Sequence, residues 1–384
     1  MRVLHIVTGL ASGGAERQLL LTVRNLPAHQ HCEVLTLTNP GAVAGALRAD
    51  GVPVHDLAMR GNRDVGALPR LVRLIRAGRY DLVHTHLYRA GLYGRLAARL
   101  AGVRAVVATE HSLHPGVIEG RPVTRGVKGL YLAAERLGRT TVAVSRQVEG
   151  TLHGWGVPPA RVELIPNGID AARYAWPAGQ RAAVRRRVRD GLGLPQGSWV
   201  IGAVGRLVPG KRFDVLLDAL RELDGPRLVL IGEGPERAAL ERRAERLGVR
   251  DRVLFTGERD DVPDLLAALD ALAAPSTEET FGLGVLEGLA AGLPVRHSAC
   301  PALDELPPAA APGALRIPSD PAAYASALRE LYDLRAAATR PLAPAPAVAR
   351  YDAARAAAEL GALYDRLVPR PASAPAGAAR GARA

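Results

Sequence analysis

The chain has 384 residues, of which 48% are hydrophobic and 23% are charged, and its formal net charge is +12. At about 150 residues per domain this length predicts two domains, and the near-average composition excludes a wholly disordered or fibrous chain. No apolar run of 18 or more residues is free of charge, which argues against a membrane-spanning helix. Cys32 and Cys300 lie far apart and imply neither a disulfide framework nor a metal site.

The positive charge alone is typical of a protein that binds nucleic acid. However, only Lys128 and Lys211 are lysines among the 50 basic residues, a bias typical of a GC-rich genome, and aromatic residues are only 4%. We therefore expect no nucleic-acid partner but anionic small-molecule ligands, and peripheral contact with an anionic membrane stays open. The N-terminus lacks the long apolar region of a signal peptide, so the expected location is cytoplasmic, with the inner membrane face left open.

Short β-type runs alternate with helical stretches over residues 1–165. Because strands alternate with helices, a parallel sheet covered on both faces is expected. Such doubly wound sheets bind ligands at the carboxyl ends of their strands. The expected strands are Val3–Thr8, Glu33–Leu37, Val54–Leu57, Leu82–Thr85, Ala105–Thr109, Thr141–Val144 and Val162–Ile165.

The alternation of strands and helices stops at Pro166-Asn167-Gly168, a combination of residues that strongly favours a turn. It restarts after an Arg-rich helical stretch, Gln180–Asp190. The predicted fold class is therefore α/β, with two Rossmann-like, doubly wound domains at residues 1–170 and 171–346 and a hinge near 166–195. A helix is expected over 347–369 and a disordered tail over 370–384. The second set of strands is Trp199–Val204, Arg227–Ile231, Val253–Thr256 and Ala271–Ala274.

A glycine loop, Gly9 to Arg17, follows the first expected strand. It matches neither the dinucleotide fingerprint nor a phosphate-binding Walker loop. Gly13 and Gly14 let main-chain amides approach a ligand closely, and the helix that follows favours an anion at its start. A tight turn without a ligand explains the pattern equally well.

Two cations bracket the loop after the restart strand, where Gly205 and Arg206 precede Lys211. Two fixed positive charges at a strand end suit a diphosphate, and they stabilise a departing phosphate without a metal. The alternative is a solvated basic loop.

Two glutamates, Glu279 and Glu287, are separated by seven residues that include Gly282 and Gly284. These glycines can open a helix whose unpaired amides face a phosphate. The two carboxylates then reach opposite ends of one elongated ligand, where they accept hydrogen bonds from sugar or ribose hydroxyls. The alternative interpretation of this pattern is two surface glutamates beside a turn, with no ligand.

Further polar residues follow other strands, and they carry weaker signals. Glu233 and Gly257 lie at strand ends where a base or ribose can rest, although ordinary turns fit as well. His84 and His86 have the spacing of a metal pair, but no third ligand is evident and no Asp-x-Asp motif occurs, so we expect no metal. His111 can bind a substrate hydroxyl or can simply pack.

Together these segments resemble the retaining glycosyltransferases of family 4, which have the GT-B fold. The resemblance implies a UDP-sugar or GDP-sugar donor held mainly by the C-terminal domain, with no cofactor and no metal. It places the acceptor, which is a sugar, a lipid-linked saccharide or a small-molecule aglycone, mainly on the N-terminal domain. The matching segments span residues 1 to about 300 and are 13–16, 165–170, 205–211, 232–235, 279–287 and 291–295.

The resemblance also implies roles for individual residues. Arg206 and Lys211 would neutralise the pyrophosphate, Glu279 would contact the transferred sugar, Glu287 the ribose, and His111 would be the active-site histidine. These residues other than Glu287 form the expected catalytic set. The expected donor-binding set is Gly13, Gly14, Gly205, Arg206, Lys211, Glu233, Gly257, Phe281, Gly282, Leu283 and Glu287.

The chain departs from the family pattern at two places. Residues 298–305 lack the usual Gly-Gly pair followed by glutamate, and Arg212 stands where a glycine is usual. Two other activities stay open on the same architecture, a nucleotide-sugar epimerase and a sugar-nucleotide binder without catalysis. Incubation with donor alone separates the epimerase, and binding without product separates the binder.

Overall fold

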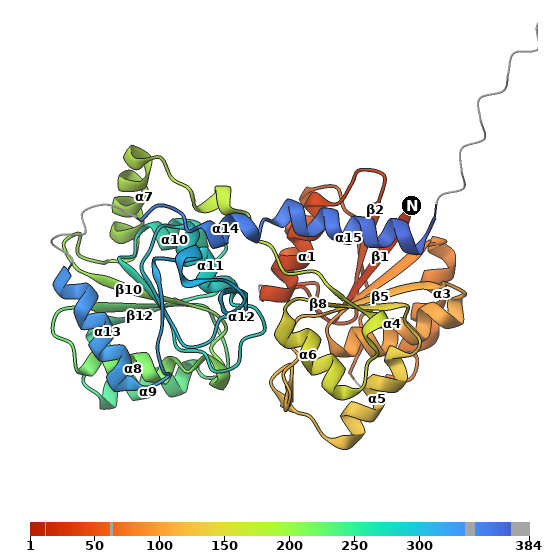
Figure 1. Cartoon of the computed structure of the whole chain (residues 1–384), viewed down its shortest axis with the longest axis horizontal. Helices are drawn as coiled ribbons and strands as arrows, with labels where there is room; N and C mark the ends of the chain where they lie inside the picture. Colours follow the sequence, from red (N-terminus) through yellow and green to blue (C-terminus); the bar gives the residue numbers. More distant parts are fainter. Residues whose placement is uncertain (12, 62–63, 335–341, 370–384) are drawn as a thin grey trace, which may run out of the picture.

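The structure is a computed structural model that describes residues 1–11, 13–61, 64–334 and 342–369, and Figure 1 shows two α/β lobes side by side. The first sheet has seven parallel strands in the order β3-β2-β1-β4-β5-β8-β9. Its strands are β1 (Arg2–Val7), β2 (His31–Thr36), β3 (Val54–Asp56), β4 (Leu82–His86), β5 (Ala105–Glu110), β8 (Thr140–Ala143) and β9 (Val162–Leu164).

The second sheet has six parallel strands in the order β12-β11-β10-β13-β14-β15. The sequence pattern did not indicate β14, β15 or the small hairpin of β6 (Val117–Ile118) and β7 (Arg121–Pro122), because elements this short carry no periodic signal. The strands are β10 (Val200–Val204), β11 (Arg227–Ile231), β12 (Val253–Gly257), β13 (Ala271–Ala274), β14 (Val295–His297) and β15 (Ala314–Arg316).

Helices cover both faces of each sheet, and this arrangement explains why the central strands are continuous apolar runs. In β1, for example, Val3, Leu4, Ile6 and Val7 are all fully buried. Among the described residues, no helix has both the length and the apolar character needed to cross a membrane. The helices that flank the first sheet are α1 (Gly14–Asn25), α2 (Gly41–Ala49), α3 (Ala67–Gly78), α4 (Tyr88–Ala101), α5 (Arg125–Glu135) and α6 (Arg146–Trp155).

The helices of the second lobe follow the same alternation. They are α7 (Ala178–Gly191), α8 (Phe213–Arg221), α9 (Arg237–Arg246), α10 (Val262–Ala267), α11 (Leu283–Ala290), α12 (Pro301–Asp304) and α13 (Pro321–Asp333). Two Rossmann-like parallel sheets in one chain confirm the predicted fold class. The domain boundaries proposed from the sequence, and the hinge between them, stay predictions.

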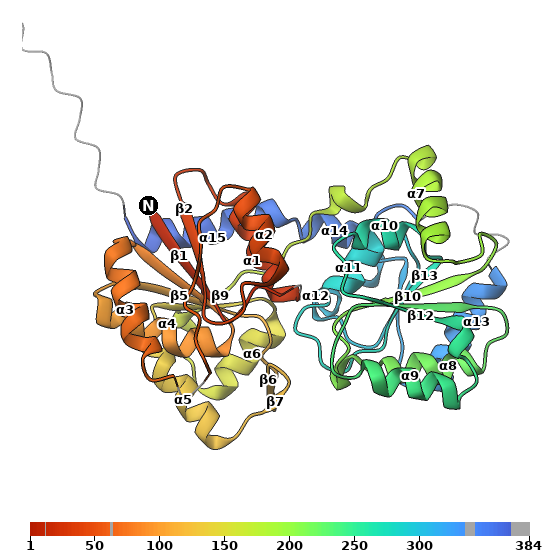
Figure 2. The same cartoon turned by 180° about the vertical axis from the view of Figure 1, so that it is seen from behind.

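The C-terminal helix expected at 347–369 is two helices, α14 (Pro346–Arg350) and α15 (Ala353–Leu367). The break arises because the main chain pairs with Ile169, whose amide donates to the Tyr351 carbonyl at 2.8 Å. Asp352 then caps α15 by accepting from the next two free amides. Figures 1 and 2 show α14 on the second lobe and α15 across the first. The expected tail at 370–384 lies outside the described residues.

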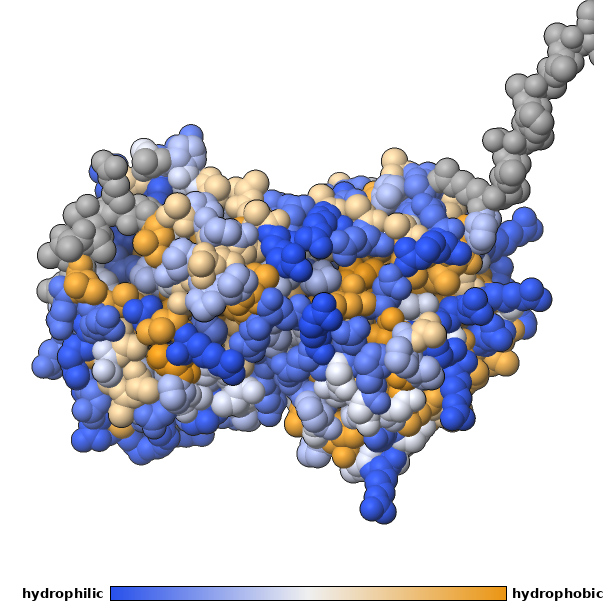
Figure 3. Space-filling model, viewed as in Figure 1, coloured by the Kyte–Doolittle hydropathy of each residue, from blue (hydrophilic) through white to orange (hydrophobic). Residues whose placement is uncertain are grey.

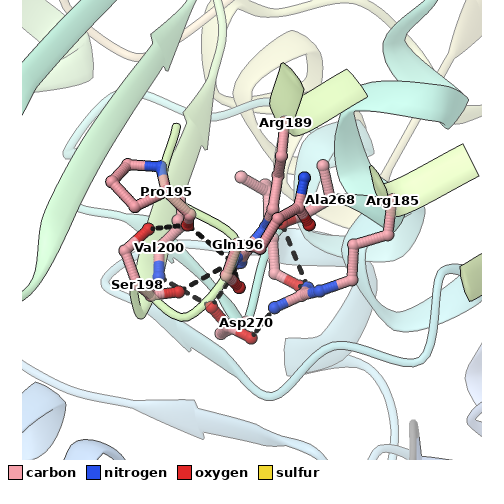
Figure 4. Close-up of polar contacts among 9 residues, drawn as sticks. Arg185, Arg189, Pro195, Gln196, Ser198, Val200, Ala268 and Asp270 are labelled. Atoms are coloured by element: carbon pink, nitrogen blue, oxygen red, sulfur yellow. Dashed lines mark hydrogen bonds and ion pairs between the residues drawn. The ribbon is translucent and has the colours of Figure 1, made fainter. Parts of the chain in front are cut away.

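A buried arginine fastens α7 to the second sheet, as Figure 4 shows. The Arg189 side chain is fully buried. Its guanidinium donates to the carbonyl oxygens of Ala268, Gln196 and Ser198 at 2.8–2.9 Å and to Asp270 Oδ2 at 2.8 Å. Asp270 also accepts from the main-chain amide that begins β10, at 2.7 Å. This network therefore fixes the start of the strand whose far end carries the predicted diphosphate loop.

Candidate active site

The carboxyl ends of the two sheets face each other where the lobes meet. The hydroxyl of Thr280, which follows β13, donates to the carbonyl oxygen of His111, which follows β5, at 2.6 Å. Arg17, in the first turn of α1, donates to the carbonyl oxygen of Arg259 in the other lobe at 2.7 Å. Figure 3 shows the surface notched at this junction. Ligands of doubly wound sheets bind at such strand ends, so the predicted loops share one cleft.

The two predicted phosphate-binding cations lie in this cleft with different surroundings. Lys211, at the end of the 3-10 turn η3 (Pro209–Lys211), forms an ion pair with Glu279, and both side chains are largely buried. Arg206 is exposed, and its side chain makes no hydrogen bond or ion pair within the described part of the chain. Its positive charge acts on Glu16 of α1, where it opposes the rise in the pKa of the carboxyl that burial causes. An incoming anion thus meets one uncommitted cation and one already paired with a carboxylate.

The two predicted glycine loops face each other across the cleft. A Cβ atom added to Gly14 would lie 3.4 Å from the Leu283 side chain, so the first turns of α1 and α11 nearly touch. Gly282, the N-cap of α11, has φ of +100°, and a Cβ there would lie 2.4 Å from Cys300 Sγ. Only glycine fits this position. At the start of α11 the amides of Leu283 and Gly284 have no hydrogen-bond partner among the residues that the structure describes.

Glu287 lies one turn into α11, close to the side chain of Tyr174. Burial raises the pKa of the Glu287 carboxyl, while the positive charges of Arg17, Arg173 and Lys211 oppose that rise. The sequence analysis missed Arg17 and Tyr174. Arg17 had a signal, since it follows the Gly-Gly pair in the first turn of a helix, whereas Tyr174, in η2 (Ala171–Tyr174), had none.

Three other predicted donor-binding residues have different surroundings. The Phe281 ring is 2% exposed and packs edge-on against Tyr351 at 5.1 Å, so it faces the core and only its main chain can line the cleft. Glu233 and Gly257 come together where β11 and β12 end, but Arg237 holds the Glu233 carboxylate at 2.7 Å. Arg237 is another neighbour that the sequence analysis missed.

The departure at 298–305 packs directly behind the predicted donor loop. Cys300 donates through Sγ to the Phe281 carbonyl oxygen at 3.5 Å. At the other end of the segment, Glu305 accepts from the amide of Arg146 in the first lobe at 3.0 Å. The unusual sequence therefore supports the loop and adds a contact between the lobes.

Four histidines of the first lobe, His5, His84, His86 and His111, lie together in its buried core. His111 is nearly buried, and its Nε2 lies 3.1 Å from His86 Nδ1. Burial lowers the pKa of His111 to about 4, so its ring is neutral at pH 7. The structure supplies a third histidine, His5 of β1, beside His84 and His86, with ring nitrogens of all three within 4.8 Å. The sequence spacing showed only two of the three, because the third comes from a different strand.

Two family models match this chain. The model for glycosyltransferase family 4 matches residues 12–173, and the model for glycosyl transferases group 1 matches residues 198–333. The chain belongs to the family 4 glycosyltransferases of GT-B fold. The family and the class of enzyme predicted from the sequence are therefore confirmed.

Individual relatives agree with this assignment. The chain is 29% identical to the UDP-Gal:alpha-D-GlcNAc-diphosphoundecaprenol alpha-1,3-galactosyltransferase of Escherichia coli, over 77% of this chain and 78% of that enzyme. It is 36% identical to the D-inositol 3-phosphate glycosyltransferase of Salinispora tropica over 66% of this chain, but spans only 57% of that relative's length.

A solved structure has the same fold. HepE of Anabaena, in complex with UDP and glucose, superposes with a TM-score of 0.82 at 22% identity, covering 95% of this chain and all of HepE.

Proposed function

We propose that this protein transfers a sugar from a UDP-sugar or GDP-sugar to an acceptor, with retention of anomeric configuration and without a metal ion. The observation that carries the proposal is the Lys211–Glu279 ion pair beside the uncommitted Arg206 in the cleft. The similar E. coli enzyme is named for UDP-Gal, and HepE was solved with UDP and glucose, so UDP-sugars are the donors to test first.

The donor diphosphate lies between Arg206, Lys211 and the unpaired amides at the start of α11. These groups supply the positive potential that a bound metal supplies elsewhere. Glu287 accepts from the ribose hydroxyls, and the positive charges of Arg17 and Arg173 favour the ionised form of its carboxyl. Glu279 faces the transferred sugar from the other side of the diphosphate loop.

In the transfer step the bond between the anomeric carbon and the diphosphate oxygen breaks, and the acceptor oxygen bonds to that carbon on the same face. The acceptor proton passes to the departing phosphate oxygen, so no protein nucleophile is required. Negative charge grows on the diphosphate, and Arg206 and Lys211 stabilise it. Removing one such contact typically raises the barrier by about 2.7–4 kcal/mol.

The acceptor binds on the first-lobe side of the cleft, near His111 and the loop after β5. Candidate acceptors are a sugar, a lipid-linked saccharide and a small-molecule aglycone. The names of two relatives suggest which acceptors to test first, because they contain a GlcNAc-diphosphoundecaprenol and an inositol 3-phosphate. Contact with a membrane surface stays a prediction.

The test is a transfer assay with UDP- and GDP-sugars, with and without EDTA. Lys211→Met is expected to lower kcat by about 100- to 1,000-fold. The double variant with Glu279→Gln separates loss of the cation from the effect of an uncompensated carboxylate. Arg212→Met is the matched control, since its guanidinium pairs with Asp214 at 3.2 Å, and its rate is expected to stay within about twofold.

For each part of the proposal, one experimental result would contradict it. Wild-type turnover in Lys211→Met removes the donor site. Loss of activity in EDTA, restored by magnesium, excludes the metal-free mechanism. An inverted product anomer excludes retention, and isomerised donor in the absence of acceptor identifies an epimerase.

A further inference from the structure

A row of three histidine rings links the buried core of the first lobe to the cleft. In the parallel register His5 of β1 lies opposite His84 of β4, and β4 pairs with β5, which His111 follows. His5 Nδ1 lies 3.1 Å from His86 Nε2, and His86 Nδ1 lies 3.1 Å from His111 Nε2. Both pairs of rings are stacked, with centroids 5.4 Å apart. The three residues form one hydrogen-bonded chain, here called the histidine chain.

Each end of the histidine chain has a nitrogen that contacts nothing polar. His5 Nε2 and His111 Nδ1 are buried and have no hydrogen-bond partner among the residues that the structure describes. His111 is the member that meets the second lobe, through its carbonyl contact with Thr280. The chain therefore has a closed end at His5 and a substrate-side end at His111.

All three rings are neutral at pH 7. Burial lowers the pKa of His5 to about 3 and that of His111 to about 4, and it holds the pKa of His86 well below its usual 6.5. A neutral imidazole carries one N–H and one lone pair. Because each hydrogen bond needs one of each, the three rings must all donate in the same direction.

Only two arrangements satisfy both hydrogen bonds. If the rings donate toward the core, His5 Nε2 carries an N–H with no acceptor and His111 Nδ1 is a bare lone pair. If they donate toward the cleft, His5 Nε2 is the bare lone pair and His111 Nδ1 carries the N–H. Each arrangement leaves one N–H and one lone pair at the two ends. Only the second puts its N–H at the His111 end, on the cleft side, where an oxygen of a bound substrate can accept from it. With substrate bound, only an acceptor is then left unpaired, and because an orphaned buried N–H is rarer in proteins than an orphaned acceptor, the second arrangement is favoured.

We infer that His5 and His86 are positioning residues that hold His111 in the Nδ1–H tautomer, so that it meets the substrate as a hydrogen-bond donor. This inference rests on the proposed function, because it assigns two further residues to the same site. Sugar hydroxyl and phosphate oxygens both accept hydrogen bonds, so a fixed donor is matched to either part of a nucleotide sugar. A His111 free to change tautomer would present the wrong group for part of the time.

His84 has a different role, although its ring lies only 4.2 Å from that of His86. Its Nδ1 is bonded to the Tyr364 hydroxyl of α15, and its Nε2 lies 2.7 Å from Thr109 Oγ1. Both nitrogens are occupied outside the histidine chain. His84→Gln is therefore a matched control, with the same burial and the same cluster but no bond to His86.

The first experiment measures the tautomer directly, by nitrogen-15 NMR of the histidine-labelled full chain, with the His111 signals assigned from their loss in His111→Phe. We expect Nδ1 to be protonated and Nε2 unprotonated in the wild type. In His86→Leu we expect a mixture of the two tautomers, and in His84→Gln the wild-type pattern. Protonated Nε2 or a mixture in the wild type overturns the inference.

The second experiment measures transfer kinetics in the same variants. We expect His86→Leu to lower kcat about tenfold, roughly the effect of one lost hydrogen bond, with the KM for donor little changed. His84→Gln is expected to stay within about threefold of wild type. Equal losses in both variants mean that the histidines act only in packing, and this overturns the positioning role.

Two outcomes separate this inference from the proposed function. If no donor is turned over, the proposed function fails, but the NMR spectrum still reports whether the tautomer is fixed. If zinc binds stoichiometrically to the wild type and not to His84→Gln, the cluster is a metal site and the inference is wrong. We expect no such binding, because His84 already uses both ring nitrogens.

Discussion

The two lobes each bury a polar cluster, and the clusters differ in how completely their groups are paired. In the second lobe, Arg189 donates to four carbonyl oxygens and to Asp270, which also pairs with Arg185 at 2.6 Å (Figure 4). In the first lobe, the histidine chain leaves one nitrogen at each end, on His5 and on His111, without a partner among the described residues.

This difference separates a structural cluster from one available to a ligand. The Arg189 cluster satisfies a full charge deep in the protein, and its bonds go from α7 to the loop that precedes β10 and to the segment between α10 and β13. Leaving such a group unpaired costs several kcal/mol, so removing one partner acts mainly on stability. Neutral histidines cost far less to leave unpaired, so a ring nitrogen at the cleft-side end of the histidine chain can stay without a partner until a substrate binds.

The largest expected effect is on the structural cluster. We expect Arg189→Leu to lower the free energy of unfolding by about 3 kcal/mol, the lower end of the range for a broken buried pair, because Arg185 still compensates Asp270. Denaturant unfolding measures this loss. Arg187→Leu, which breaks an exposed pair with Asp264, is the control at about 0–1 kcal/mol. Equal losses in both variants would show that burial of the arginine adds nothing.

The next largest effect is the loss of unfolding free energy in acid that the buried histidine chain causes. Below pH 6.5 the unfolded chain takes up protons that buried His5, with a pKa of about 3, does not take up, so the folded state loses stability as pH falls. At pH 4.5 this amounts to about 2–3 kcal/mol for one histidine. Between pH 7.5 and 4.5 we expect His5→Leu to gain this much relative to wild type, measured by denaturant unfolding at both pH values.

The control for the acid experiment is His31→Leu, at an exposed histidine that begins β2. Its stability relative to wild type is expected to be the same at both pH values. A His5→Leu difference that also stays constant with pH would mean that His5 takes up its proton in the folded state, and the histidine chain would not be neutral.

The smallest expected effect is that of a variant which tests whether His84 and Tyr364 belong to the histidine chain. Tyr364→Phe removes the hydroxyl that bonds His84 Nδ1, so we expect a loss of about 1 kcal/mol in unfolding free energy. The transfer rate and the His111 tautomer should not change. A shifted tautomer in the NMR spectrum would show that His84 and Tyr364 belong to the histidine chain after all.

Much of the fold was predictable, because strands buried on both faces are continuous apolar runs that turn residues interrupt. The break between α14 and α15 was not predictable, since it depends on main-chain pairing between Ile169 and the segment at Tyr351 and Asp352, far apart in sequence. The ring of Phe281 shows the same limit. Its place beside glycines suggests a loop, but its packing against Tyr351 turns it into the core.

The site divides in the same way. Lys211, Glu279, Arg206 and Glu287 follow recognisable local patterns, because phosphate and hydroxyl recognition needs particular side chains next to glycine turns. The sequence alone therefore determined the family, the fold class and the candidate site residues. Only the tertiary structure decided that Lys211 pairs with Glu279 and that three histidines form a chain. Those contacts join residues from different strands and loops, and their distances depend on how the sheets pack rather than on any local pattern.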